Sequence, residues 1–317
     1  METSTTSKAN RALLLKRCFL FVVCGAALLE TILHFAFKNR APTEQQWKEI
    51  RPRVEGLYSP GDIVAVAPQW GEPLAREALG DSMMPLSMVA RADDDAFPRV
   101  VEIDILGQRL PEFSTWPIIR KQTFGKFDLS IRKNPSWQKV RFDAVDHVDS
   151  ATLSISIQRP NGQDACSFSD SAPMSAGNLG GDPTSPRVRF SCPGGTFHWV
   201  GVTIIDDEHY RPRRCIWAPP STLGNLVLRF QRVPFGKKLV GHAGAPWLMV
   251  RDGVGPPIQF SAASGNGTLG SVAARDTDGW IRFEWNTERL DNTIGDLELR
   301  IAQVQSEQRF CFALEAR

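Results

Sequence analysis

The densest group of polar side chains in this 317-residue sequence is Asp206, Asp207, Glu208 and His209. Carboxylate oxygens are the ligands that calcium and magnesium ions prefer, so Asp206 and Asp207 could hold a divalent cation. The spacing of an EF-hand is absent, however, and successive side chains on an extended chain point to opposite sides. We therefore expect a solvated hairpin turn here and no cofactor, with a bound cation as the alternative.

No other motif in the sequence specifies a reaction. The chain lacks G-x-S-x-G, a P-loop, H-E-x-x-H and a G-x-G-x-x-G that follows a strand pattern. None of the five histidines has a serine or cysteine in a convincing catalytic setting. His242 lies among small residues in VGHAGAPW, where the backbone could approach a ligand, although a loop between strands is the commoner explanation. The catalytic residues are thus unknown, and the pattern favours a protein that is not an enzyme.

Nine tryptophans against two tyrosines is an unusual ratio. The faces of aromatic rings can stack on sugar rings, so an exposed group of them would favour glycan binding. Trp70 and Trp247 are the best candidates because each lies beside glycine and proline in loop-like sequence. The alternative for any single tryptophan is that it fills the core, which the alternating pattern predicts for Trp285.

Two carboxylates lie on one face of the strand pattern VVEIDIL, Glu102 and Asp104. If both were buried, the pKa of one of them would be raised. We expect instead that this face is solvated or that it pairs with Arg76 of the preceding helix.

An apolar run of 20 residues occupies positions 18–37. At about 1.5 Å per residue, a helix of this length matches the roughly 30 Å hydrocarbon thickness of a bilayer. Basic residues outnumber acidic ones before the run, which favours a cytoplasmic N-terminus. The sequence predicts a cytoplasmic tip at 1–17, a single-pass signal-anchor in the cell membrane, and a periplasmic or extracellular remainder. Cleavage near the small residues Gly25, Ala26 and Ala27 is the alternative.

Within this run, Glu30 and His34 lie four residues apart, so they share one face of a helix. Ionisable groups at membrane depth often mark a contact, here with a polytopic membrane protein. The alternative is that both side chains reach water at the outer interface.

Four cysteines follow the apolar run: Cys166, Cys192, Cys215 and Cys311. An even number in an oxidising compartment predicts two disulfides, with three possible pairings, and the absence of C-x-x-C argues against zinc. Cys192 with Cys215 is the favoured pair because they flank a predicted hairpin. Cys166 with Cys192 is the competing pair, and Cys311 is a candidate free thiol.

The net charge of +2 comes from 37 basic and 35 acidic residues. No basic stripe is interleaved with aromatic residues, so we expect no nucleic-acid partner.

Residues 43–117 alternate between helix and strand patterns. Helices are expected at 43–58 and 73–81, and strands at 61–68, 84–90 and 99–107. The order predicts a small α/β module with parallel pairing.

A resemblance to a known family rests on two motifs, PGDIVAVAPQW and FPRVVEIDILG. An exit helix is expected before them and an alanine-rich helix between them. This segment resembles the small soluble α/β region that follows the last membrane helix in polytopic glycosyltransferases using lipid-linked sugars. The resemblance implies a shared compartment and an association with envelope glycan assembly. It does not imply catalysis, because those enzymes carry their catalytic acidic residues in loops between early membrane helices, which this chain lacks.

From residue 124 onward the apolar period becomes two. Leu153, Ile155 and Ile157 alternate with serines, and similar alternation recurs at 188–192, 226–230 and 281–285 between glycine-rich turns. We expect a jelly-roll-like antiparallel β-sandwich over 124–317. The fold class is then α+β and mostly β, with a transmembrane helix and a small α/β module before the sandwich.

These features favour a membrane-anchored envelope protein with a non-catalytic binding or accessory role in cell-envelope glycan metabolism. One alternative is a glycan-acting hydrolase or transferase that uses Asp206, Asp207 or Glu208. Another is a structural subunit of a polytopic membrane enzyme, recognised through Glu30 and His34.

Overall fold

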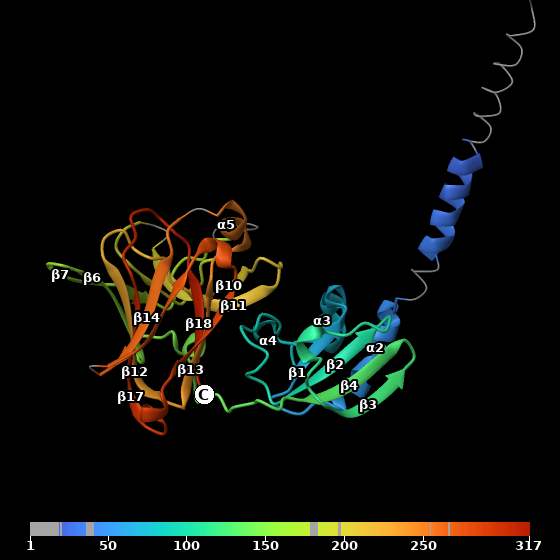
Figure 1. The fold of residues 1–317 in the computed structure, drawn as a ribbon, viewed down its shortest axis with the longest axis horizontal. Coiled ribbons are helices and arrows are strands. Elements are labelled where there is room, and N and C mark those ends of the chain that lie inside the picture. The colour runs from blue at the N-terminus through green and yellow to red at the C-terminus, as the bar shows by residue number, and fades with distance from the viewer. Residues whose placement is uncertain are drawn as a thin grey trace, which may run out of the picture. The chain divides into compact units, whose positions relative to one another are not determined.

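The computed structural model describes residues 19, 21–35, 41–177, 183–195, 198–253, 255–265 and 267–317. The chain divides into two compact units, shown in Figure 1. The first comprises Met1–Met84 and Arg99–Pro135, and the second comprises Pro85–Pro98 and Ser136–Arg317.

Residues 21–35 of the predicted membrane segment are helical. Their large apolar side chains are exposed, as Phe21 at 77% and Leu28 at 64% illustrate. Positions 18, 20, 36 and 37 and the predicted cytoplasmic tip lie outside the described residues. Among the residues that the structure describes, no helix combines the length and the apolar character needed to cross a membrane.

The first unit is a four-stranded sheet with helices against it. Its elements are α2 (Glu44–Glu55), β1 (Ile63–Ala67), η1 (Gln69–Gly71), α3 (Glu72–Leu79), β2 (Arg99–Ile105), η2 (Pro111–Phe113), β3 (Ile118–Phe124) and β4 (Phe127–Lys133). The strand order is β1-β2-β4-β3. β1 and β2 pair in parallel, as the sequence predicts, and the other pairs are antiparallel.

Helix α2 begins where the sequence supplies a capping box. The Thr43 hydroxyl accepts from the Gln46 amide at 3.3 Å, and the Gln46 side chain accepts from the Thr43 amide at 2.9 Å. The buried face of the helix carries Trp47, whose ring meets Phe127 of β4 edge-on at 4.8 Å between centroids. Burial of this face against the sheet supplies the core of the unit.

The sheet extends past residue 117, where the sequence pattern placed the end of the module. β3 and β4 belong to this sheet, and Phe127, Leu129 and Ile131 of β4 are buried in it. An alternating pattern predicts a strand with one buried face but does not identify the sheet that the strand joins. The predicted module ends at residue 117, whereas the first compact unit ends at Pro135.

The expectation that Glu102 and Asp104 face solvent is wrong. Glu102 is fully buried and its carboxylate lies 2.5 Å from the Arg132 guanidinium of β4, while Arg76 pairs with Asp81. Asp104 is 4% exposed, and its Oδ1 has no hydrogen-bond partner among the described residues. Burial, and next the charge of Glu102, raise the pKa of Asp104 to about 7.

Asp104→Asn is expected to remove a pH dependence from the stability of the first unit. The unfolded pKa is about 3.9, so the folded state favours the protonated carboxyl, and stability falls as pH rises from about 4 through about 7. At about pH 8 the free energy of unfolding of the variant, measured with urea, should exceed that of the wild type by about 1–3 kcal/mol. At about pH 4 the two should differ little. Asp170→Asn, at an exposed carboxylate, is the control. If Asp104→Asn changed the free energy of unfolding equally at both pH values, the raised pKa of Asp104 would be contradicted.

The second unit contains two sheets. The eight-stranded sheet has the order β16-β13-β18-β11-β10-β9-β8, with β5 also pairing β18, and the six-stranded sheet has the order β15-β14-β17-β12-β6-β7. Their pairs are antiparallel. The strands are β5 (Phe142–Asp143), β6 (Leu153–Arg159), β7 (Gly162–Ala165), β8 (Ser167–Ser169), β9 (Arg189–Ser191), β10 (Trp199–Asp206), β11 (Pro212–Trp217), β12 (Asn225–Pro234), β13 (Lys238–Gly244), β14 (Ile258–Ser264), β15 (Gly267–Ala274), β16 (Ile281–Asn286), β17 (Ile294–Ile301) and β18 (Cys311–Ala316).

Helical segments of this unit are short. They are α4 (Leu86–Val89), η3 (Ala144–His147), α5 (Trp247–Asp252), η4 (Asp276–Asp278) and η5 (Glu288–Leu290). One apolar core draws buried residues from both sheets, such as Leu228 of the six-stranded sheet and Phe312 of the eight-stranded sheet. The predicted antiparallel β-sandwich is confirmed.

The segment Pro85–Pro98 belongs to the sandwich, although its neighbours in sequence belong to the first unit. The Ala90 carbonyl accepts from the Arg214 amide at 2.5 Å, and Asp93 lies 3.0 Å from the Arg317 guanidinium. Residues 84–90, predicted as a strand, instead contain the short helix α4. Apolar runs this short do not distinguish a strand from a turn of helix.

The disulfides are Cys166–Cys192 and Cys215–Cys311, so the favoured pair Cys192–Cys215 is wrong and Cys311 is not free. The register explains both bonds. Ser167 pairs with Ser191, which brings Cys166 and Cys192 together at the end of β8 and β9. Cys215 instead lies opposite Thr203 on β10, and β11 pairs with β18, which carries Cys311.

Candidate functional site

The predicted carboxylate cluster occupies the turn between β10 and β11. Asp207 is 1% exposed, and its Oδ1 accepts from the amides of His209 at 2.8 Å and Arg211 at 2.9 Å. Its Oδ2 accepts from Arg213 Nε at 2.8 Å. A hairpin turn is therefore present as expected, but Asp207 is buried and not solvated, because its carboxylate satisfies the amides of the turn.

The two neighbouring carboxylates are placed differently. Glu208 accepts from the Trp280 amide at 2.9 Å, and a Cβ at Gly279 would lie 2.4 Å from the Glu208 carboxyl group. Asp206 is half-buried, and burial together with the charge of Asp207 raises its pKa. Within the described part of the chain, no three histidine, cysteine or acidic side chains lie close enough to hold a metal ion.

The same turn projects Tyr210 outward. Tyr210 has φ of +59°, a conformation that non-glycine residues rarely adopt, and its amide donates to the Asp207 carbonyl at 3.0 Å. Its side chain is 67% exposed. The hydrogen bonds that the turn makes to Asp207 hold Tyr210 in this conformation. The buried Asp207 thus determines where an exposed aromatic ring lies.

Tyr210 contacts Trp247, one of the two predicted tryptophans. Their ring centroids are 5.2 Å apart at an interplanar angle of 50°, and the guanidinium of Arg251 lies 5.3 Å from the Trp247 ring centroid. Trp247 and Arg251 are both on α5, which ends at Gly253 in the left-handed region with φ of +62°. We call Tyr210, Trp247 and Arg251 the aromatic cluster. Tyr210 is exposed, whereas Trp247 is half-buried, and its indole nitrogen is buried without a hydrogen-bond partner among the described residues. The guanidinium of Arg251 over the Trp247 ring is a cation–π contact.

The other predicted residues lie elsewhere. Trp70 is 55% exposed, but it is in η1 of the first unit. His242 is in β13 rather than a loop, and it is buried and stacked on Trp280 at 6.1 Å with an interplanar angle of 10°. Burial lowers the pKa of His242 to about 4, so the imidazole is neutral near pH 7. Glu30 and His34 are both in the helical residues 21–35.

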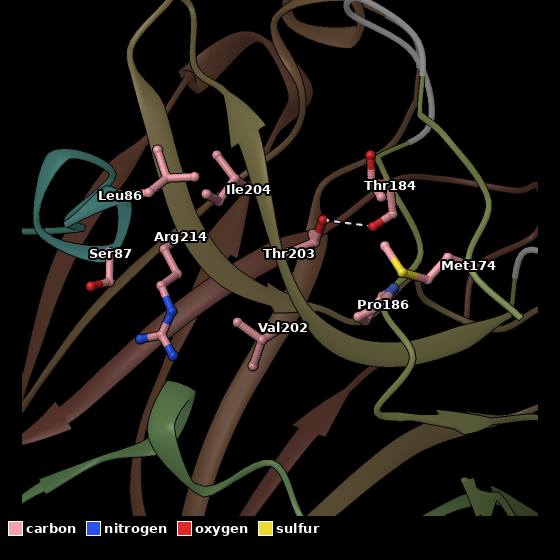
Figure 2. Close-up of a pocket in the computed structure, with 9 residues that line it drawn as sticks. All are labelled: Leu86, Ser87, Met174, Thr184, Pro186, Val202, Thr203, Ile204 and Arg214. Carbon is pink, nitrogen blue, oxygen red and sulfur yellow. Dashed lines mark hydrogen bonds between the residues drawn. The ribbon is translucent and has the colours of Figure 1, made fainter. Parts of the chain in front are cut away.

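A second feature of the sandwich is an open pocket of about 430 Å³, shown in Figure 2. Two neighbouring strands line it, β10 through Val202 and Ile204 and β11 through Arg214. It is also lined by Leu86 of α4 and by Met174 and Pro186, which lie between β8 and β9. The Thr203 hydroxyl donates to the Thr184 carbonyl at 2.9 Å at its edge. The pocket is mostly apolar, and Arg214 is the charged residue that lines it.

Asp207→Asn is expected to destabilise the protein by about 3 kcal/mol, because it leaves the largely buried Arg213 without its anion. Asp206→Asn is the matched control, at the adjacent half-buried carboxylate, and should change the free energy of unfolding by about 1 kcal/mol or less. Urea unfolding measures both. Equal effects of the two substitutions would show that Asp207 does not hold the turn.

Sequence reasoning missed Tyr210, Arg251 and the pocket. Tyr210 directly follows the carboxylate cluster in sequence, and it is one of two tyrosines in the chain. Its outward position depends on Asp207 being buried, which the polar pattern did not suggest. The pocket joins residues about a hundred positions apart, so no local signal could have located it.

No protein-family model matches this sequence, and no curated protein matches it. Similar solved structures include TmCBM61 in complex with beta-1,4-galactotriose, at 10% identity over 37% of this chain and 82% of that chain, with a TM-score of 0.26. The family 11 carbohydrate-binding module from Clostridium thermocellum, in complex with a mixed-linked tetrasaccharide, aligns at 13% identity over 37% of this chain and 82% of that one, with a TM-score of 0.23.

The tandem CBM51 modules of the family 98 glycoside hydrolase Sp3GH98 from Streptococcus pneumoniae SP3-BS71 align at 9% identity with a TM-score of 0.28. That alignment covers 62% of this chain and 57% of the tandem modules, so this chain spans a little over half of their length. At these identities and TM-scores the similarities do not assign the chain to a family.

Proposed function

We propose that this chain is a single-pass, membrane-anchored envelope protein whose sandwich binds a glycan without catalysis. The observation that carries the proposal is the aromatic cluster. Tyr210 is exposed against Trp247. Arg251 donates from its Nε to Asp252 Oδ1 at 2.8 Å, and its other N–H groups are the donors beside the rings. Apolar faces of a sugar ring can stack on aromatic faces, and its hydroxyl groups can accept from a guanidinium.

The contacts of the carboxylates favour binding over hydrolysis. Two acidic groups must face the scissile bond about 5–9.5 Å apart for glycoside hydrolysis. Asp207 is committed to Arg213 and to turn amides, and Glu208 is committed to the Trp280 amide. These bonds would have to break before either group could transfer a proton, so the hydrolase or transferase alternative has less support.

Membrane anchoring is supported by the apolar run at 18–37 and by the exposed apolar side chains of helical residues 21–35. A helix with apolar side chains on every side is expected to be buried, and a bilayer would bury it. The basic residues before the run favour an exported sandwich, and disulfides are stable in an oxidising compartment. Deletion of residues 1–40 is expected to release the protein from the membrane fraction; retention there would contradict the anchor.

The role of the first unit stays a prediction. Its resemblance to the soluble region of glycosyltransferases that use lipid-linked sugars suggests an accessory role in envelope glycan assembly. The jelly-roll connectivity and a contact of Glu30 and His34 with a polytopic partner are likewise predictions.

The binding proposal is tested with the intact chain in lipid nanodiscs, passed over a panel of immobilised cell-envelope polysaccharides. We expect salt-resistant retention on at least one of them and elution by its soluble oligosaccharide. Failure to bind any glycan on the panel would overturn the proposal.

A further inference from the structure

The pocket beside α4 has a defined apolar floor. Ile204 and Arg214 lie directly opposite each other on β10 and β11, and Val202 is on the same face of β10. Successive side chains of a strand alternate between faces, so these three side chains project together. Val202 also packs against the sandwich core, which fixes the floor to a rigid part of the unit.

Two exposed apolar side chains flank this floor. Leu86 of α4 is 43% exposed and Met174 is 58% exposed, and both line the pocket. Figure 2 shows them on opposite sides of the β10–β11 hairpin. The volume of about 430 Å³ falls in the range of about 300–1,000 Å³ that is typical of small-molecule sites. Apolar walls around so few polar groups match an apolar ligand body.

Arg214 supplies the polar end. Its side chain is 27% exposed, and its Nη1 lies 2.8 Å from the Asp146 carboxylate. Asp146 is 59% exposed, so this ion pair contributes little and its carboxylate can turn to water. A guanidinium has five N–H donors, and its planar fork suits a carboxylate.

We propose that this pocket binds a small amphipathic carboxylate, with its apolar body over Val202 and Ile204 and its carboxylate on Arg214. The site shares no residue with the aromatic cluster, so it does not depend on glycan binding. The Arg214 guanidinium and the apolar lining favour an anion with an apolar chain over a sugar.

The test uses the intact chain in lipid nanodiscs, with carbon-13-labelled methionine methyl groups. Octanoate is titrated in, with 1-octanol as the uncharged ligand of the same chain length. We expect a saturable shift of the Met174 methyl signal, assigned by Met174→Leu. Arg214→Gln should weaken the apparent affinity for octanoate about tenfold or more and change that for 1-octanol about twofold or less.

Arg229→Gln is the matched control, since Arg229 is in the six-stranded sheet, pairs with Glu298 and does not line the pocket. Leu86→Trp, at an exposed position, should fill the mouth of the pocket and prevent the shift with both ligands. It also provides a second variant if Arg214→Gln proves unstable. The proposal is wrong if octanoate leaves the Met174 signal unchanged, or if Arg214→Gln and Arg229→Gln have the same effect on octanoate.

Discussion

Replacing Trp247 with alanine is expected to weaken retention of the protein on its glycan about tenfold or more, and Tyr210→Ala is expected to do the same. The two rings lie 5.2 Å apart, so each supports the other as well as the sugar. A stacked aromatic contact contributes about 0.5–1.5 kcal/mol beyond the area that it buries, and about 1.4 kcal/mol corresponds to a tenfold change in affinity. Affinity chromatography against the selected polysaccharide measures the loss.

Trp70→Ala and Trp137→Ala are the matched controls. Trp70 is exposed in the first unit, and Trp137 is 43% exposed with its indole N–H donating to Ala96. Both should leave retention unchanged. Loss of retention on Trp70→Ala, with Trp247→Ala still binding, would transfer the glycan site to the first unit and contradict this account.

Removing the Cys215–Cys311 disulfide is expected to be the most destabilising change to the sandwich. The bond closes a loop with a sequence separation of 96, and the chain-entropy estimate for such a loop is about 4.7 kcal/mol. Cys166–Cys192 has a separation of 26, for which the same estimate is about 3.5 kcal/mol. Urea unfolding of the two double Cys→Ala variants should therefore show the larger loss for Cys215 and Cys311.

The surroundings of the two disulfides strengthen this order. Cys215 and Cys311 are fully buried with Trp199 and Trp217, whereas Cys166 and Cys192 lie beside a short strand pair nearer the surface. Equal losses for the two double variants, or a larger loss for the Cys166 and Cys192 variant, would contradict this interpretation.

Much of the sandwich could be predicted because its strands follow one rule. Leu153, Ile155 and Ile157 are buried in the core, and alternation makes each such strand visible in a single sequence. The parallel pairing of β1 with β2 was likewise predictable from the short apolar run, the helix and the second run.

The sequence did not reveal features that depend on which distant strands pair, or on a segment that belongs to the other unit than its sequence neighbours. Cys215 meets Cys311 only because β11 pairs with β18, and no local pattern specifies that pairing. β4 carries the same alternation as the sandwich strands, yet it pairs with β2 and β3 in the first sheet. Residues 85–98 belong to the second unit, although the residues before and after them belong to the first. A division of the sequence into consecutive domains does not allow this arrangement.

The candidate site shows the same division. Trp247 was predicted to be exposed because of its loop-like surroundings, whereas the structure places it half-buried on α5 beside Tyr210. The carboxylates were identified as a group, but their role follows from burial, which residue type alone does not give. Asp207 holds a turn, and that turn positions the aromatic ring which sequence reasoning passed over.

The most direct test of glycan binding at the aromatic cluster is an NMR titration of the indole N–H signals in the nitrogen-15-labelled chain. The oligosaccharide that elutes the protein is the titrant, and Trp247→Phe assigns the signal of Trp247. We expect the Trp247 signal to shift and saturate, while that of Trp47, which is buried in the first unit, stays fixed. If the protein binds the oligosaccharide and the Trp247 signal does not move, the glycan is bound elsewhere and the account is wrong.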